Sequence, residues 1–94
     1  MPTRIAGKTV IITGASSGLG RALAQQYAST GATLGLLGRR EDALRELADS
    51  LPGEHCCYAV DVRDRQGLHA AAQDFIAFCQ GRVDVVIASA GISA

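Results

Sequence analysis

The sequence has no excess of charge, no long hydrophobic run and only one lysine. Its 94 residues carry nine basic and nine acidic side chains, so the formal net charge is zero. Binding to nucleic acid or to an anionic membrane surface relies on a surplus of positive charge, and this balance predicts neither partner. No apolar run is long enough to cross a bilayer. Residues 1–8 lack the continuous apolar core and the cleavage site of a signal peptide. We therefore expect a soluble, cytoplasmic protein.

Cysteine is too scarce for a disulfide framework or a zinc centre. The chain has three cysteines, of which Cys56 and Cys57 are adjacent and Cys79 lies in a predicted helix. His55 precedes the adjacent pair and suggests a metal site. On a strand, however, His55 and Cys57 point to one face while Cys56 points to the other, and no second cluster has the spacing of zinc ligands. We therefore predict no metal site and interpret the cysteines as small apolar core residues.

A glycine-rich turn follows the first apolar run. The run 9–13 leads into Gly14, Gly18 and Gly20, after which residues 21–26 favour a helix. Gly14 permits a tight turn, Gly18 lets the backbone approach a pyrophosphate, and Gly20 lets helix and strand pack closely. The free N–H groups and the positive end of the helix then face the anion. This order of elements predicts a dinucleotide phosphate site.

The whole chain alternates strands and helices. The expected strands are 9–13, 33–38, 55–60 and 83–89, and the first two expected helices are 20–30 and 41–51. A third helix is expected between an N-cap at Asp64 and an end at Gly81. Its apolar face would consist of Leu68, Ala71, Ala72, Phe75 and Cys79. Short connections between alternating elements imply a parallel sheet covered on both faces. We predict an α/β fold, the first half of a Rossmann-type doubly wound sheet with strand order 3-2-1-4. No linker divides residues 1–94, and the ligand should lie at the carboxyl ends of the strands.

The end of the second strand favours NADP over NAD. A site that prefers NAD places an acidic residue here to bind the ribose 2′-hydroxyl. Gly38 occupies this position without a side chain, and Arg39 and Arg40 follow. Arginine presents a planar fork that suits a 2′-phosphate. A hydrogen bond to a charged group contributes roughly 1.5–3 kcal/mol, which corresponds to an NADP preference of about tenfold to a hundredfold. The alternative is that both arginines are merely solvated at a helix start.

The ends of the third and fourth strands carry further candidate residues. Asp61 could accept a hydrogen bond from the adenine 6-amino group, with a second contact from the backbone of Val62. The alternative is that Asp61 only organises the following loop. Ser89, Ala90 and Gly91 are small enough for a cofactor to approach the backbone, although small residues also suit tight packing.

Taken together, these motifs resemble the N-terminal half of a short-chain dehydrogenase/reductase over nearly the whole chain. The matching residues are Thr13-Gly14-x-x-x-Gly18-x-Gly20, Gly38-Arg39, Asp61-Val62 and Ala90-Gly91. The glycine spacing resembles that of the compact, single-domain branch of the family. The resemblance implies these contacts: the phosphates with Ser16, Ser17, Leu19 and Gly20, the 2′-phosphate with Arg39, adenine with Asp61 and Val62, and the ribose and nicotinamide side with Ser89, Ala90 and Gly91.

Two features depart from the family pattern. Ser89 stands where the family usually has asparagine. Serine provides a hydroxyl at this position but lacks the side-chain amide of asparagine. The family's catalytic Tyr-x-x-x-Lys pair and upstream Ser are also absent. The residues four positions after Tyr27 and Tyr58 are Gly31 and Val62. We therefore assign no catalytic residue and interpret residues 1–94 as an NADP-binding half-domain, truncated before the catalytic half and inactive alone.

The resemblance implies an NADP(H)-dependent oxidoreductase that transfers hydride between the nicotinamide and a small carbonyl or alcohol substrate, as a homo-oligomer when full length. The alternative is a non-catalytic module that binds NADP or senses its redox state. The run Val85-Val86-Ile87 is typical of a strand buried on both faces. A chain that ends after this strand would expose a hydrophobic edge, so we expect the isolated 94 residues to be marginally stable or to aggregate.

Overall fold

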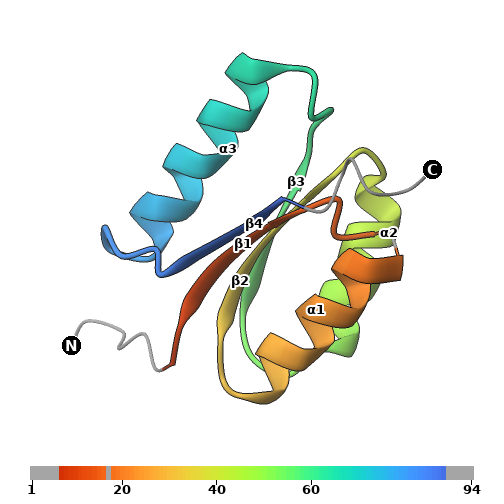
Figure 1. Cartoon of the computed structure of the whole chain (residues 1–94), viewed down its shortest axis with the longest axis vertical. Coiled ribbons are helices and arrows are strands. Elements are labelled where there is room, and N and C mark those ends of the chain that lie inside the picture. Colours follow the sequence, from red (N-terminus) through yellow and green to blue (C-terminus); the bar gives the residue numbers. More distant parts are fainter. Residues whose placement is uncertain (1–6, 17, 89–94) are drawn as a thin grey trace.

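The computed structural model describes residues 7–16 and 18–88. The elements in chain order are β1 (Thr9–Thr13), α1 (Gly18–Ser29), β2 (Thr33–Gly38), α2 (Glu41–Ser50), β3 (His55–Ala59), α3 (Arg65–Phe78) and β4 (Val85–Ala88). Helices α1 and α2 lie on one face of the sheet and α3 on the other (Figure 1). No helix in these ranges combines the length and the apolar character that crossing a membrane requires.

The sheet has the predicted topology. Its strand order is β3-β2-β1-β4, and all three neighbouring pairs are parallel. Because the strands are parallel, their carboxyl ends meet at one edge of the sheet, and β1 is central with β2 and β4 beside it. The α/β fold class and the strand order are confirmed. The main differences are that α1 begins two residues earlier than predicted and that β3 and β4 are shorter.

The core forms one cluster on each face of the sheet. Val10 and Ile12 of β1 pack with α1 and α2, whereas Ile11 packs with α3. The predicted stripe of α3 is confirmed, since Ala71, Phe75 and Cys79 are buried and Leu68 and Ala72 are partly buried against the same cluster. The Phe75 ring lies directly over Gly35, where an added Cβ would be 2.8 Å from the ring. A strand residue without a side chain thus lets α3 lie close to the sheet.

The predicted N-cap of α3 is confirmed. The Asp64 side chain accepts a hydrogen bond from the Gly67 N–H at 3.0 Å. This bond satisfies one of the backbone donors that the first turn leaves unpaired. At the other end Gly81 has φ +88°, and its N–H donates to the carbonyl of Ile76 at 2.8 Å. Both ends of α3 therefore follow from residue types visible in the sequence.

The segment around His55 is structural. Cys56 packs toward α3 and Cys57 toward α2, which confirms that they face opposite ways. The His55 ring accepts a hydrogen bond from the Leu34 N–H at Nδ1 (3.1 Å), so its Nε2 carries the proton and donates to the Pro52 carbonyl (2.8 Å). Both ring nitrogens are thus used within the fold. The described residues contain no cluster of three metal-ligating side chains.

Within the described residues, β4 is not buried on both faces. Val86 is 65% exposed, the most exposed large hydrophobic side chain in the described ranges. It pairs in register with Ile11 and therefore shares the face that α3 covers. Helix α3 packs over β2, and Ile11 is buried in the cluster beneath it while Val86 is not. An apolar run predicts a strand but not which helix will cover it.

Candidate functional site

The turn after β1 has the geometry that the glycine pattern predicts. Gly14 has φ +66°, a conformation that residues with a side chain rarely adopt. The N–H of Ala15 donates to the carbonyl of Leu37 at 3.0 Å, which fastens the turn to the end of β2. Helix α1 begins four residues after Gly14, and its first turn carries no acidic side chain. Its N-terminal N–H groups can therefore meet an anion without competition from a neighbouring carboxylate.

The other two glycines of the motif have different surroundings. A Cβ on Gly20 would collide with the carbonyl oxygen of Gly14 and come within 2.9 Å of the Ala15 Cα. Gly20 therefore lets α1 pack closely against the turn that follows β1, whereas the prediction had named the strand itself. A Cβ on Gly18 would meet nothing within 4 Å. Gly18 thus borders open space, which leaves its predicted role in approaching a phosphate as a prediction.

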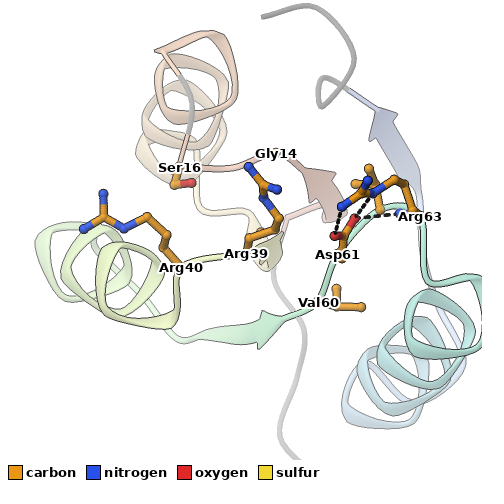
Figure 2. Close-up of a pocket in the computed structure, with 9 residues that line it drawn as sticks. Gly14, Ser16, Arg39, Arg40, Val60, Asp61 and Arg63 are labelled. Atoms are coloured by element: carbon orange, nitrogen blue, oxygen red, sulfur yellow. Dashed lines mark hydrogen bonds and ion pairs between the residues drawn. The ribbon is translucent and has the colours of Figure 1, made fainter.

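A pocket of about 280 Å³ lies where the ends of β1, β2 and β3 meet. It is lined by Gly14, Ser16, Gly38, Arg39, Arg40, Val60, Asp61, Val62 and Arg63 (Figure 2). The N–H of Val60 donates to the Gly38 carbonyl at 2.7 Å and joins the ends of β3 and β2. The structure thus brings together residues from three of the four predicted strand ends.

Gly38 shapes the floor of this pocket. A Cβ at Gly38 would lie 3.3 Å from a methyl group of Leu44 and 3.5 Å from the Ser16 hydroxyl oxygen. Any side chain here, including the carboxylate typical of a site that prefers NAD, would fill the space below the glycine-rich turn. Its absence leaves the position to the next residue, Arg39.

The two arginines after β2 point in different directions. Figure 2 shows Arg39 extending toward the Gly14 turn and Arg40 extending away from it. The Arg40 guanidinium lies 3.3 Å from the Asp42 carboxylate in the first turn of α2. The backbone N–H of Ala43 and this guanidinium together lower the pKa of Asp42. Arg39 forms no ion pair with any residue in the described ranges, so its charge is directed toward the pocket.

Asp61 has the loop-organising role considered for it, whereas its contact with adenine stays a prediction. It lines the pocket and also organises its own loop, because its Oδ1 accepts a hydrogen bond from the Arg63 N–H at 2.9 Å. The Arg63 guanidinium adds bonds of 3.2 Å from Nε and 2.9 Å from Nη2. These contacts lower the pKa of Asp61 to about 2, with a smaller contribution from the charge of Arg39. Asp61 is therefore a carboxylate at neutral pH.

Arg63 and Val60 line the pocket but were not among the predicted site residues. The sequence held a signal for Arg63, since it stands two positions after Asp61 with opposite charge. Leu19 lies in the first turn of α1 and is 47% exposed. It does not line the pocket. The predicted contacts of Ser17, Ser89, Ala90 and Gly91 fall on residues outside the described ranges.

Comparison with known proteins identifies the family. The family model for short chain dehydrogenases matches residues 8–94. This chain belongs to the short-chain dehydrogenase family. It is 38% identical over 93 residues to the D-threitol dehydrogenase of Mycolicibacterium smegmatis, covering 96% of this chain and 35% of that protein. The chain therefore spans about a third of the length of this relative.

Solved structures of the family share the fold. An L-sorbose reductase from Gluconobacter frateurii, in complex with NADPH and L-sorbose, superposes with a TM-score of 0.77 at 34% identity. A 3-ketoacyl-(acyl-carrier-protein) reductase from Brucella melitensis, in complex with NADH, superposes with a TM-score of 0.79 at 26% identity. The matches cover 92% and 88% of this chain, and 34% of each of those chains. These two short-chain dehydrogenase relatives differ in the nicotinamide cofactor bound, so the family alone does not decide between NADP and NAD.

Proposed function

We propose that this chain is the NADP(H)-binding half of an oxidoreductase that transfers hydride between the nicotinamide and a small carbonyl or alcohol substrate. The observation that carries the choice of cofactor is the pair Gly38 and Arg39 at the end of β2. Gly38 removes the position from which a carboxylate would bind a 2′-hydroxyl, and Arg39 extends toward the glycine-rich turn. The 2′-phosphate of NADP(H) would then meet a cation that has no ion-pair partner among the described residues.

The remaining pocket residues suit the rest of the dinucleotide. The turn at Gly14 and the N-terminus of α1 would take the pyrophosphate, and the adenine would lie against Val62 and the Asp61 carboxylate. Val62 is 41% exposed and offers apolar surface to a ring. We further propose that the substrate pocket and the contacts of a homo-oligomer lie on residues outside this chain, and that the protein works in the cytoplasm.

The test is a comparison of cofactor affinities in the protein encoded by the complete reading frame. We expect Kd for NADPH to be about tenfold to a hundredfold lower than Kd for NADH, measured by fluorescence titration. Arg39→Gln should bring the two values close together by weakening NADPH alone, because only NADPH carries the 2′-phosphate. Arg45→Gln is the matched control, since Arg45 is also exposed but pairs with Glu41 on α2, outside the pocket. Equal affinities in the unmodified protein would overturn the choice of NADP.

A further inference from the structure

The pocket is lined by more positively charged side chains than a single contact with a 2′-phosphate requires. Three arginines line it, together with a single carboxylate, Asp61. Arg40 is engaged by Asp42, and Arg63 by Asp61, whereas Arg39 has no ion-pair partner in the described part of the chain. Of the three arginines, Arg40 and Arg63 are therefore ion-paired, and Arg39 is not paired within the described residues.

Asp61 could engage Arg39 if nothing else held it. The two residues line the same pocket, and the charge of Arg39 already acts on the Asp61 carboxyl group. A carboxylate free to rotate would be drawn toward this cation, because opposite charges at the end of adjacent strands attract. A pair between Arg39 and Asp61 would neutralise the group expected to bind a 2′-phosphate. It would also place a negative charge beside an anionic ligand.

Arg63 contacts both oxygens of the Asp61 carboxylate. Its backbone N–H and its Nε both donate to Oδ1 of Asp61, at 2.9 and 3.2 Å, and its Nη2 donates to Oδ2 at 2.9 Å. Both carboxylate oxygens are thus directed to Arg63, as the dashed lines in Figure 2 show. A two-pronged bond of this kind fixes the plane of a carboxylate as well as its position.

We infer that Arg63 is a positioning residue for cofactor discrimination, holding the Asp61 carboxylate so that Arg39 stays available for the 2′-phosphate. This inference rests on the proposed function, because it concerns the same pocket and the same ligand. Arg63 acts through Asp61 and not by binding the phosphate itself. Loss of its side chain leaves only the backbone N–H bond, which no longer holds the second oxygen.

The test is a double-mutant cycle on the protein encoded by the complete reading frame. The quantity measured is the ratio of Kd for NADH to Kd for NADPH, because both cofactors share the adenine contacts and differ only at the 2′-phosphate. The Arg63 side chain is 81% exposed, and exposed ion pairs are weak. We therefore expect Arg63→Gln to lower the ratio by about two- to fivefold. Arg63→Lys, which keeps the positive charge, should lower this Kd ratio less than Arg63→Gln does.

The Asp61→Asn background distinguishes positioning from direct binding. If Arg63 acts through Asp61, adding Arg63→Gln to Asp61→Asn should leave the ratio unchanged. The same fall in both backgrounds would overturn the inference and make Arg63 a direct phosphate ligand. Arg65→Gln is the control, since it removes the same charge from an exposed arginine two residues further along that does not line the pocket.

A second measurement needs no cofactor. The pKa of Asp61, followed by NMR titration, should rise toward the ordinary value of 3.8 in Arg63→Gln and not in Arg65→Gln. An unchanged Asp61 pKa in Arg63→Gln would overturn the inference. The proposed function fails separately, if the unmodified protein binds NADPH and NADH equally. A strong NADPH preference that depends on Arg39 but not on Arg63 would contradict this inference alone.

Discussion

At the scale of single residues, the site depends on two glycines that stand two positions apart and serve different ends. Gly20 has no room for a side chain, because the Gly14 carbonyl lies against it. Gly18 has open space around it, and its φ lies outside the left-handed region that disfavours other residues. One glycine is thus required by packing within the chain, and the other is expected to be required by the ligand.

The pair Gly18→Ala and Gly20→Ala separates these requirements. Gly18→Ala should leave stability unchanged or raise it by about 0.4–1 kcal/mol, because alanine restricts the unfolded chain. It should nonetheless weaken NADPH binding by about tenfold, since a methyl group would keep the phosphate from the backbone. Gly20→Ala should cost about 1–3 kcal/mol of stability through overpacking. Urea unfolding and NADPH titration on each variant provide the check, and a stable Gly20→Ala protein would contradict the packing role.

At the scale of elements, the joint between β1 and β4 is made by polar groups at their amino ends. Thr9 is fully buried, and its hydroxyl donates to the Arg82 carbonyl at 2.6 Å. The Asp84 carboxylate accepts from the Thr9 N–H at 2.9 Å, while the Asp84 N–H donates to the Thr9 carbonyl at 2.9 Å. These bonds lie at the end of the sheet opposite the pocket. They join the amino end of β1 to the residue that precedes β4, beside the parallel pairing of the two strands.

This joint makes the stability of the chain depend on acidity. The Thr9 N–H first, and the Arg82 side chain next, lower the pKa of Asp84 below its ordinary value of 3.8. A carboxyl group with a lowered pKa contributes stability that is complete above the pKa of the unfolded chain and is lost as the pH falls through the folded pKa.

Asp84→Asn should therefore lower the unfolding free energy at pH 7 and lose this effect in acid. The difference in unfolding free energy between Asp84→Asn and the unmodified chain should shrink as the pH falls below about 4. It should vanish well below the pKa of Asp84 in the folded chain. Urea unfolding at a series of pH values measures both proteins. A difference that stayed constant down to pH 2 would show that the charge of Asp84 does not stabilise the joint.

At the scale of the whole molecule, the two faces of the sheet are covered unequally. Helices α1 and α2 bury one face, while α3 alone covers the other and leaves Val86 exposed (Figure 1). Ile76 and Phe78 of α3 are also 38% and 43% exposed. Exposed apolar groups beside an edge strand favour self-association. These exposures support the expectation that the isolated 94 residues are marginally stable or aggregate.

Reading the native transcript past codon 94 tests this interpretation. We expect an open frame that supplies a Ser, followed by Tyr-x-x-x-Lys, and the encoded longer protein should stay monodisperse in gel filtration where the 94-residue chain aggregates. Such a frame supports the oxidoreductase. A stop codon at this point would instead favour the non-catalytic NADP-binding alternative, and a monomeric 94-residue chain with sharp, reversible unfolding would contradict the predicted aggregation.

The sequence by itself determined the order of elements, the strand order, the turn at Gly14 and the cap at Asp64. Apolar periodicity, glycine and capping residues act over a few neighbouring positions, so these features are visible locally. Only the tertiary structure decided that Arg39 extends to the pocket while Arg40 pairs with Asp42, and that Arg63 holds Asp61. It also decided that the Phe75 ring of α3 lies over Gly35 of β2. Side-chain direction and helix coverage depend on which elements meet in space, and no short stretch of sequence carries that information.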